Sequence, residues 1–276
     1  MEALRAPGPL RAVELRPPRV GLIGGRSVDA WIDLNQAMRA LLRAGRFVLF
    51  TDDAVGDPEE ESLQHLTSNL GAGHDLSRVV PFLTCKHSLE YCLLFARRAA
   101  SHRLGALTVT GGDRSVGPAR CVPHSRDLRR LIREQVPDLA LGAWVNPFRD
   151  PGEQVDLLLD PDFYADYVLT QVVSHHEIEP LERFLATAAE RGVTLPILVG
   201  VFYYRSGRPR TLERLGKFIP VPADALREEF ERGATPEAVC ARSLEALRER
   251  GIEKIYLSNL EPRKAEERLR RIEALL

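Results

Sequence analysis

The sequence predicts a single (β/α)8 barrel, and two features of the chain lead to this prediction. Eight short apolar runs recur along its 276 residues, and segments whose apolar residues have helical spacing lie between them. Alternation of strand and helix is typical of a parallel sheet, and eight repeats close such a sheet into a barrel. The predicted strands are residues 12–15, 46–50, 79–85, 106–110, 140–145, 167–171, 196–201 and 254–258.

The helices between these strands are predicted from apolar stripes and capping residues. A stripe that includes Trp31 predicts a helix over residues 27–43, and Gly45 follows as its stop. Asp57-Pro58 predicts the start of the next helix, because aspartate caps a helix and proline fits its first turn. Further helices are predicted over residues 87–102, 125–135, 178–191, 235–250 and 262–275.

Two segments depart from this regular pattern. Residues 1–11 are rich in Pro, Gly and Arg and are predicted to be a flexible leader, so residues 12–276 form one catalytic barrel. Residues 207–233 follow the seventh strand and are predicted to hold two short helices. Such an enlarged loop either covers a substrate or is surface decoration.

Composition narrows the class of partner. The chain has 38 basic and 39 acidic residues and a net charge of -1, which gives no attraction to nucleic acid or to an anionic membrane. We therefore expect a small-molecule partner, while the oligomeric state stays open. The sequence has neither a long apolar span nor the pattern of a secretory signal, so a cytoplasmic location is expected.

The cysteines are spaced irregularly and show no CxxC pair. For this reason neither a disulfide framework nor a structural zinc site is expected from them. They are Cys85, Cys92, Cys121 and Cys240.

Candidate site residues follow from barrel geometry. The carboxyl ends of the strands meet at one mouth, so polar residues at these ends come together. They include no serine or cysteine paired with histidine, which disfavours triad chemistry. Polar groups beside an aromatic side chain suit a planar heteroaromatic ligand whose edge is recognised by hydrogen bonds. The residues are Glu14, Thr51, Thr84, Asp113, Asn146, Gln171, Tyr203 and Asn259.

Four segments resemble motifs of the methylenetetrahydrofolate reductases. Glu14 lies shortly before the Pro17-Pro18 pair, as in the first-strand motif of that family. Residues 82–85, 108–113 and 169–171 resemble the third-, fourth- and sixth-strand motifs in the same order and with similar separations. The likeness extends over almost the whole chain.

The resemblance implies the reduction of 5,10-methylenetetrahydrofolate to 5-methyltetrahydrofolate by a hydride. It implies that Glu14 is the general acid that opens the five-membered ring, a role that suits a carboxyl kept protonated by burial. Asp113 matches the aspartate that binds the pterin and supports the cationic intermediate. The expected substrate contacts are Gln171, Tyr203, Thr84 and Asn146, and the expected cofactor contacts are Thr51 and Gly112.

The sequence departs from flavin-dependent members of that family. Those members carry histidine, arginine and tyrosine where this chain has Phe82, Gly111 and Asn146. Residues 151–166 are also acidic, and their aspartates, Asp156, Asp160, Asp162 and Asp166, are expected to repel a flavin diphosphate. We therefore predict direct hydride transfer from NADH or NADPH, with an FAD-mediated reaction as the alternative.

Other interpretations of the same residues stay open. Glu14 could be the ion-pair partner of an arginine, Asp113 a turn residue, and Gln171 an amide inside the barrel. Two further classes of protein are a barrel lyase or hydrolase that uses Glu14 and Asp113, and a folate-binding barrel without reductase activity. His175-His176 looks like part of a metal cluster, but adjacent side chains on a strand or loop diverge, so no metal site is expected.

Overall fold

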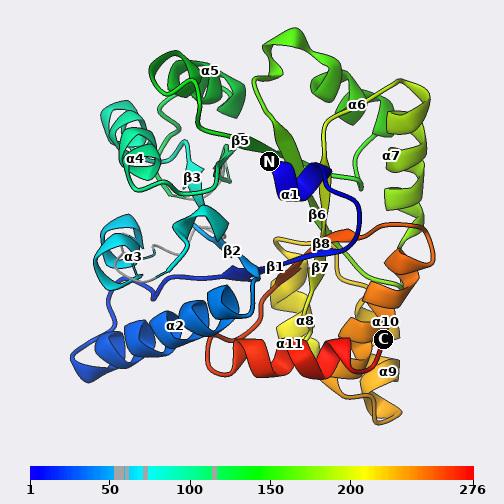
Figure 1. Ribbon diagram of the computed structural model, residues 1–276. Coiled ribbons are helices and arrows are strands. Elements are labelled where there is room, and N and C mark those ends of the chain that lie inside the picture. Colours follow the sequence, from blue (N-terminus) through cyan, green and yellow to red (C-terminus); the bar gives the residue numbers. More distant parts are fainter. Residues whose placement is uncertain (53–58, 60–61, 71–73, 114–116) are drawn as a thin grey trace.

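The computed structural model describes residues 1–52, 59, 62–113 without 71–73, and 117–276. Eight parallel strands each pair with the next along the chain, and the last pairs with the first, so the barrel closes (Figure 1). The predicted single (β/α)8 barrel is confirmed. The strands are β1 (Leu10–Leu15), β2 (Phe47–Phe50), β3 (Val79–Thr84), β4 (Leu107–Thr110), β5 (Leu141–Val145), β6 (Tyr167–Val173), β7 (Ile197–Phe202) and β8 (Lys254–Ser258).

Helices surround these strands, as Figure 1 shows. The two helices predicted after the seventh strand are present as α8 and α9, whereas α6, within the acidic segment 151–166, was not predicted. The predicted helix start at Asp57-Pro58 lies outside the described residues. The helices are α1 (Glu2–Arg5), α2 (Gly25–Arg43), α3 (Ser62–Leu70), α4 (Leu89–Ser101), α5 (Ser125–Gln135), α6 (Pro151–Leu159), α7 (Glu179–Glu190), α8 (Pro209–Gly216), α9 (Ala223–Glu231), α10 (Pro236–Arg248) and α11 (Ala265–Glu273), with short 3-10 turns at η1 (Leu76–Arg78) and η2 (Pro161–Phe163).

The first residues of the chain lie at the amino-terminal end of the barrel. Met1, Ala3 and Leu4 pack against the apolar cluster that contains Leu10. Lys254 at the start of β8 donates hydrogen bonds from Nζ to three carbonyls of this segment, at 2.6 to 3.3 Å. The segment expected as a flexible leader thus contains α1 and makes defined contacts, and β1 begins two residues earlier than predicted.

Alternation along the strands sorts the apolar core into two layers. Residues such as Leu49, Phe82 and Tyr256 fill the inside of the barrel, whereas residues such as Val13 and Val48 pack between the strands and the helices. Each strand therefore presents one set of side chains inward. The inward side chains nearest the carboxyl ends of the strands line the mouth of the barrel.

Two glycines on strands make room for tyrosines inside the barrel. An ideal Cβ on Gly142 would lie 2.4 Å from Cζ of Tyr167, and one on Gly200 would lie 2.5 Å from Cζ of Tyr256. Tyr256 donates a hydrogen bond from its hydroxyl to the Thr170 carbonyl at 2.7 Å. The interior is thus filled by large rings opposite positions that have no side chain.

Candidate functional site at the barrel mouth

Glu14 points into the barrel because it continues the inward set of Leu10 and Ala12 on β1. Its residue surface is 9% exposed, and its Oε1 accepts a hydrogen bond from Ser258 Oγ on β8 at 2.7 Å. Burial raises the pKa of Glu14, while the Ser258 hydrogen bond and the charge of Arg16 oppose part of that rise. The carboxyl therefore keeps its proton to higher pH than an ordinary glutamate does.

Ser258 is a site residue that the sequence analysis missed. Its signal is parity on β8, since Lys254 and Tyr256 precede it at alternate positions and Tyr256 fills the barrel interior. Pairing of β1 with β8 brings the two side chains together, although 244 residues separate them along the chain.

Thr51 contacts a second buried carboxyl at the mouth. Its hydroxyl donates to Glu59 Oε2 at 3.0 Å, and Arg16 Nε donates to Glu59 Oε1 at 2.9 Å. The Glu59 side chain is 2% exposed, and burial raises its pKa to about 7 despite the arginine. Arg16 Nη2 is buried with no hydrogen-bond partner among the described residues, so a ligand at this end of the barrel could accept from it.

Thr84, expected to contact substrate, lies at the end of β3 and is 2% exposed. Its backbone N–H donates to Asp52 Oδ2 at 2.6 Å, and His87 Nε2 lies 2.8 Å from Asp52 Oδ1. The Thr84 hydroxyl is buried and has no hydrogen-bond partner within the described part of the chain. Buried polar groups are normally paired, so this hydroxyl is available to a bound ligand.

Positive charge gathers at the end of β4, around Gly111 and Gly112. Arg120 donates a hydrogen bond to the Gly112 carbonyl. Its guanidinium packs against Gly111, since an ideal Cβ added to that glycine would lie 2.6 Å from Arg120 Cζ. The Lys86 side chain packs in the same way against Gly112. Arginine is absent from position 111, but a guanidinium from position 120 fills the space beside it.

Asp113 follows these glycines and is exposed, immediately before residues 114–116, which lie outside the described residues. It belongs to the same end of the barrel as Glu14, since Glu14 lies next to the carboxyl end of β1 and Asp113 follows the carboxyl end of β4. Glu14 is buried and Asp113 is exposed, so the two expected catalytic carboxyls differ in their environments.

Asn146 and Gln171 use their side-chain oxygens locally. Asn146 Oδ1 accepts from the Phe148 N–H at 3.0 Å, and Gln171 Oε1 accepts from the Val172 N–H at 2.9 Å. Gln171 lies at an irregularity of β6, where the pairing with β7 shifts between Leu169 and Val172. Both residues are partly buried at the carboxyl ends of their strands, so their amide NH2 groups are the parts that could serve a ligand.

Tyr203 does not line the mouth as expected. It is buried in the layer between strands and helices, where its hydroxyl donates to Glu237 Oε1 on α10 at 2.9 Å. Tyr204 instead continues the inward set, and its ring packs 4.9 Å from that of Phe202. The alternation of inward residues along β7 would have distinguished the two tyrosines. Asn259, also expected at the mouth, donates from Nδ2 to the Tyr203 carbonyl at 3.0 Å.

Three of the four aspartates of residues 151–166 form ion pairs with arginines. Asp166 directly precedes β6, and its carboxylate pairs with Arg133 and accepts from the Leu141 N–H, so it lies at the amino-terminal end of the barrel. Asp160 and Asp156 are also paired, with Arg126 at 2.6 Å and Arg191 at 2.7 Å. Asp156, Asp160 and Asp166 are thus each paired with an arginine, and Asp166 lies at the end of the barrel opposite the mouth, so these three give no support to the expected repulsion of a flavin diphosphate.

A surface hollow of about 320 Å³ lies beside these residues and is lined by Arg133, Phe163 and Asp166. It is formed around the loop before β6, away from the carboxyl ends of the strands. The hollow is therefore separate from the candidate site at the barrel mouth.

These observations define the class: a (β/α)8 barrel with a buried, hydrogen-bonded carboxyl at the end of its first strand. No family model matches the chain, and no curated protein matches it. Within the described part of the chain, no helix is long and apolar enough to cross a membrane.

Solved structures share the fold. An uncharacterised protein from Clostridium thermocellum, described as binding two copies of 5-methyl-5,6,7,8-tetrahydrofolic acid, has a TM-score of 0.68 and 15% identity over 99% of this chain and 96% of that one. An F420-dependent secondary alcohol dehydrogenase, in complex with an F420-acetone adduct, has a TM-score of 0.60 and 11% identity over 98% of this chain and 99% of that one. At these identities the likeness establishes the fold.

Proposed function

We propose that this protein binds a reduced folate at the barrel mouth and reduces 5,10-methylenetetrahydrofolate with a hydride from NADH or NADPH. The observation that carries the proposal is Glu14, a buried carboxyl with a raised pKa at the end of β1. Two neighbours in fold support the class of chemistry, since one is described as a folate binder and the other as a deazaflavin-dependent dehydrogenase.

In the proposed reaction Glu14 donates its proton to the departing amine nitrogen of the five-membered ring. The bond between that nitrogen and the methylene carbon breaks, and the resulting iminium carbon accepts the hydride, which gives the methyl group and the oxidised nicotinamide. Burial serves this step because it raises the pKa of the carboxyl, so Glu14 holds the proton it donates to higher pH than an ordinary glutamate does. Ser258 holds the carboxyl in place from β8.

The buried Thr84 hydroxyl and the Arg16 guanidinium provide donors for the polar edge of the ligand. Asp113, Gln171 and Asn146 remain our proposed contacts from the ends of β4, β6 and β5. Thr51 and Gly112 remain proposed for the nicotinamide side, with Lys86 and Arg120 beside Gly112 to balance its phosphates.

The alternative is an FAD-mediated version of the same reaction. Lys86 and Arg120 supply cations that would also suit a flavin diphosphate. Phe82 lies inside the barrel and is 6% exposed, so the position that carries histidine in flavin-dependent members is apolar here. We retain direct hydride transfer as the proposed reaction. In the alternative, a bound flavin would carry the hydride from the nicotinamide to the folate.

The experiment is an NADH-oxidation assay with methylenetetrahydrofolate on protein purified without added flavin, together with an absorbance spectrum. Direct transfer predicts turnover by a colourless protein. A stoichiometric yellow chromophore that turnover requires would establish the flavin version. Calorimetric titrations with the folate and with NADH separately, read beside this assay, identify the second candidate, a folate-binding barrel without reductase activity, which binds folate tightly and consumes no NADH.

A further inference from the structure

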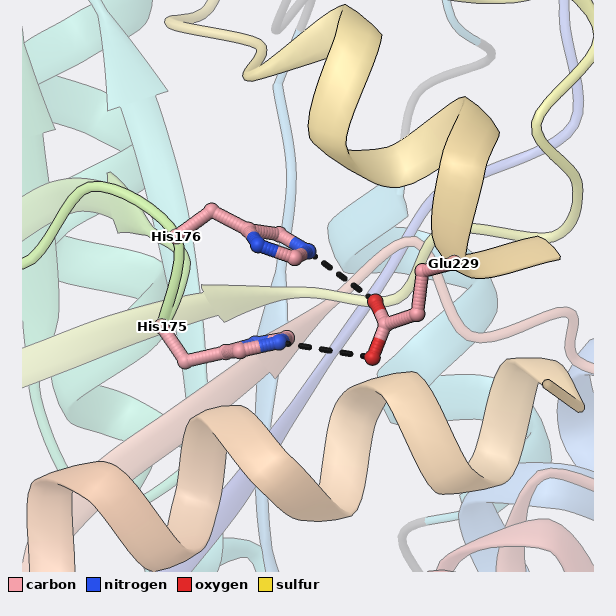
Figure 2. Close-up of side chains that lie close together, drawn as sticks. All are labelled: His175, His176 and Glu229. Carbon is pink, nitrogen blue, oxygen red and sulfur yellow. Dashed lines mark hydrogen bonds and ion pairs between the residues drawn. The ribbon is translucent and has the colours of Figure 1, made fainter. Parts of the chain in front are cut away.

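Three side chains that could bind a metal ion meet between the turn after β6 and helix α9. Figure 2 shows the rings of His175 and His176 pointing from the turn toward the carboxylate of Glu229. His176 Nε2 lies 2.9 Å from Glu229 Oε2, and His175 Nε2 lies 3.4 Å from Glu229 Oε1. All three side chains are partly buried, with exposed fractions of 14 to 18%.

Adjacent histidines were expected to diverge, and here they converge because they lie in a turn. The Glu177 N–H donates to the Ser174 carbonyl at 3.0 Å and closes this turn. The two imidazole centroids are consequently 3.9 Å apart. The third member, Glu229, lies 53 residues beyond His176. It belongs to α9, in the insertion of residues 207–233 after β7, and the sequence spacing gives no sign that it would meet the histidines.

From this geometry we infer that His175, His176 and Glu229 form a binding site for a divalent transition metal, with Zn²⁺ as the favoured ion. Two imidazole nitrogens and one carboxylate oxygen are a set that Zn²⁺ accepts, and they leave a fourth position for water or an anion. Ligand bonds of about 2.0–2.1 Å in a tetrahedron separate the donor atoms by roughly 3.3 Å. The donor atoms here lie within 4.8 Å of one another, so small side-chain movements would suffice.

A residue outside this trio is suited to orient one ligand. His175 Nδ1 lies 2.9 Å from Ser243 Oγ on α10, and the His175 backbone N–H also donates to that oxygen. Histidines that bind metal commonly donate their other ring N–H to such an acceptor, which fixes the tautomer with Nε2 free for the ion.

Arg242 on α10 is the competing cation at this site. Its Nε contacts Glu229 Oε1, while Oε2 faces His176. The Arg242 side chain is 47% exposed and can move toward solvent when an ion binds. Without a metal, ring protons on both Nε2 atoms and this guanidinium would satisfy the carboxylate.

The inferred ion joins the turn after β6 to α9, which belongs to the insertion that follows β7. A bound ion would fix this insertion against the barrel independently of any folate chemistry. Loss of reductase activity in an assay would thus leave the metal proposal untouched, and the reverse holds as well.

The test is calorimetric titration of chelator-treated full-length protein with ZnSO4, followed by metal analysis after dialysis. We expect one Zn²⁺ per chain, and a loss of affinity of at least about tenfold in H176A and in E229Q. H102A removes an exposed histidine at the end of α4 and is the matched control, expected to bind as the wild type does. R242Q removes the competing cation and is expected to bind at least as tightly.

Titration with CoCl2 separates this site from the cysteines, because thiolate ligands give an intense charge-transfer band that nitrogen and oxygen ligands lack. Circular dichroism of each variant establishes that it is folded, and H175A gives a second independent removal of a ligand. Wild-type protein without stoichiometric Zn²⁺ would overturn the proposal and leave a hydrogen-bonded cluster only. Affinity unchanged in folded H176A and E229Q would overturn it equally.

Discussion

Replacement of Gly200 by alanine tests the packing inside the barrel. The added Cβ would lie 2.5 Å from both Cζ and the hydroxyl oxygen of Tyr256, so this ring must move. Gly200 does not have a positive φ, and the cost is therefore steric. Displacing Tyr256 also lengthens the hydrogen bond from its hydroxyl to the Thr170 carbonyl, now 2.7 Å.

Overpacking of a filled core costs about 1–3 kcal/mol, and a buried carbonyl that loses its donor costs about 1–3 kcal/mol more. We expect Gly200→Ala to lower the free energy of unfolding by about 3 kcal/mol. For a chain of this size that corresponds to a fall in Tm of roughly 6–12 °C, measured by calorimetry or by circular dichroism on heating.

Gly216→Ala is the matched control, because its Cβ would meet nothing within 4 Å at the end of α8. Its Tm should stay within about 2 °C of the wild type. Adding Tyr256→Phe to Gly200→Ala removes the hydroxyl that the new methyl group meets, so the two changes should be less than additive. A Gly200→Ala protein as stable as Gly216→Ala would refute the packing derived for the interior.

Three further predictions concern charged groups. Folding raises the pKa of Glu59 from 4.5 to about 7, so between these pH values the folded chain binds more protons than the unfolded chain. The free energy of unfolding should therefore fall by up to about 3 kcal/mol as the pH rises from 4.5 to about 7. Glu59→Gln should reduce this pH dependence in urea titrations at several pH values. Glu14→Gln should lower kcat for methylenetetrahydrofolate reduction by at least about 100-fold, with folate affinity retained. The control is Glu266→Gln, which alters a buried carboxyl on α11 and should leave turnover unchanged. Equal turnover in both variants would remove Glu14 from the mechanism. Arg129 donates from Nε and Nη2 to the Phe163 carbonyl at 3.0 and 2.8 Å, so Arg129→Met should cost about 2–4 kcal/mol in urea unfolding, and a loss below 0.5 kcal/mol would contradict that role.

Local periodicity determined the architecture of this protein. Strand-length apolar runs recur eight times, helix-length stripes follow all but the fifth of them, and a chain that alternates these elements closes as a barrel. Because every second side chain of a strand faces inward, the same alternation predicts that Glu14, Thr51 and Thr84 face the inside of the barrel at the carboxyl ends of their strands. On β7 the same alternation places Tyr204 inward and Tyr203 in the layer between strands and helices, so the expectation for Tyr203 at the mouth was wrong.

Contacts between distant segments were decided by the tertiary structure. Ser258 meets Glu14 because closure pairs the last strand with the first, and Arg120 fills the space beside Gly111 because the loop after β4 folds back. Whether an acidic residue faces the mouth or the opposite end depends on the direction of its neighbouring strand, which placed Asp166 far from any ligand at the mouth. His175 and His176 gain Glu229 only when the insertion packs against the turn after β6. Sequence patterns report the period of each element, while pKa values and ligand sets depend on which elements become neighbours in space.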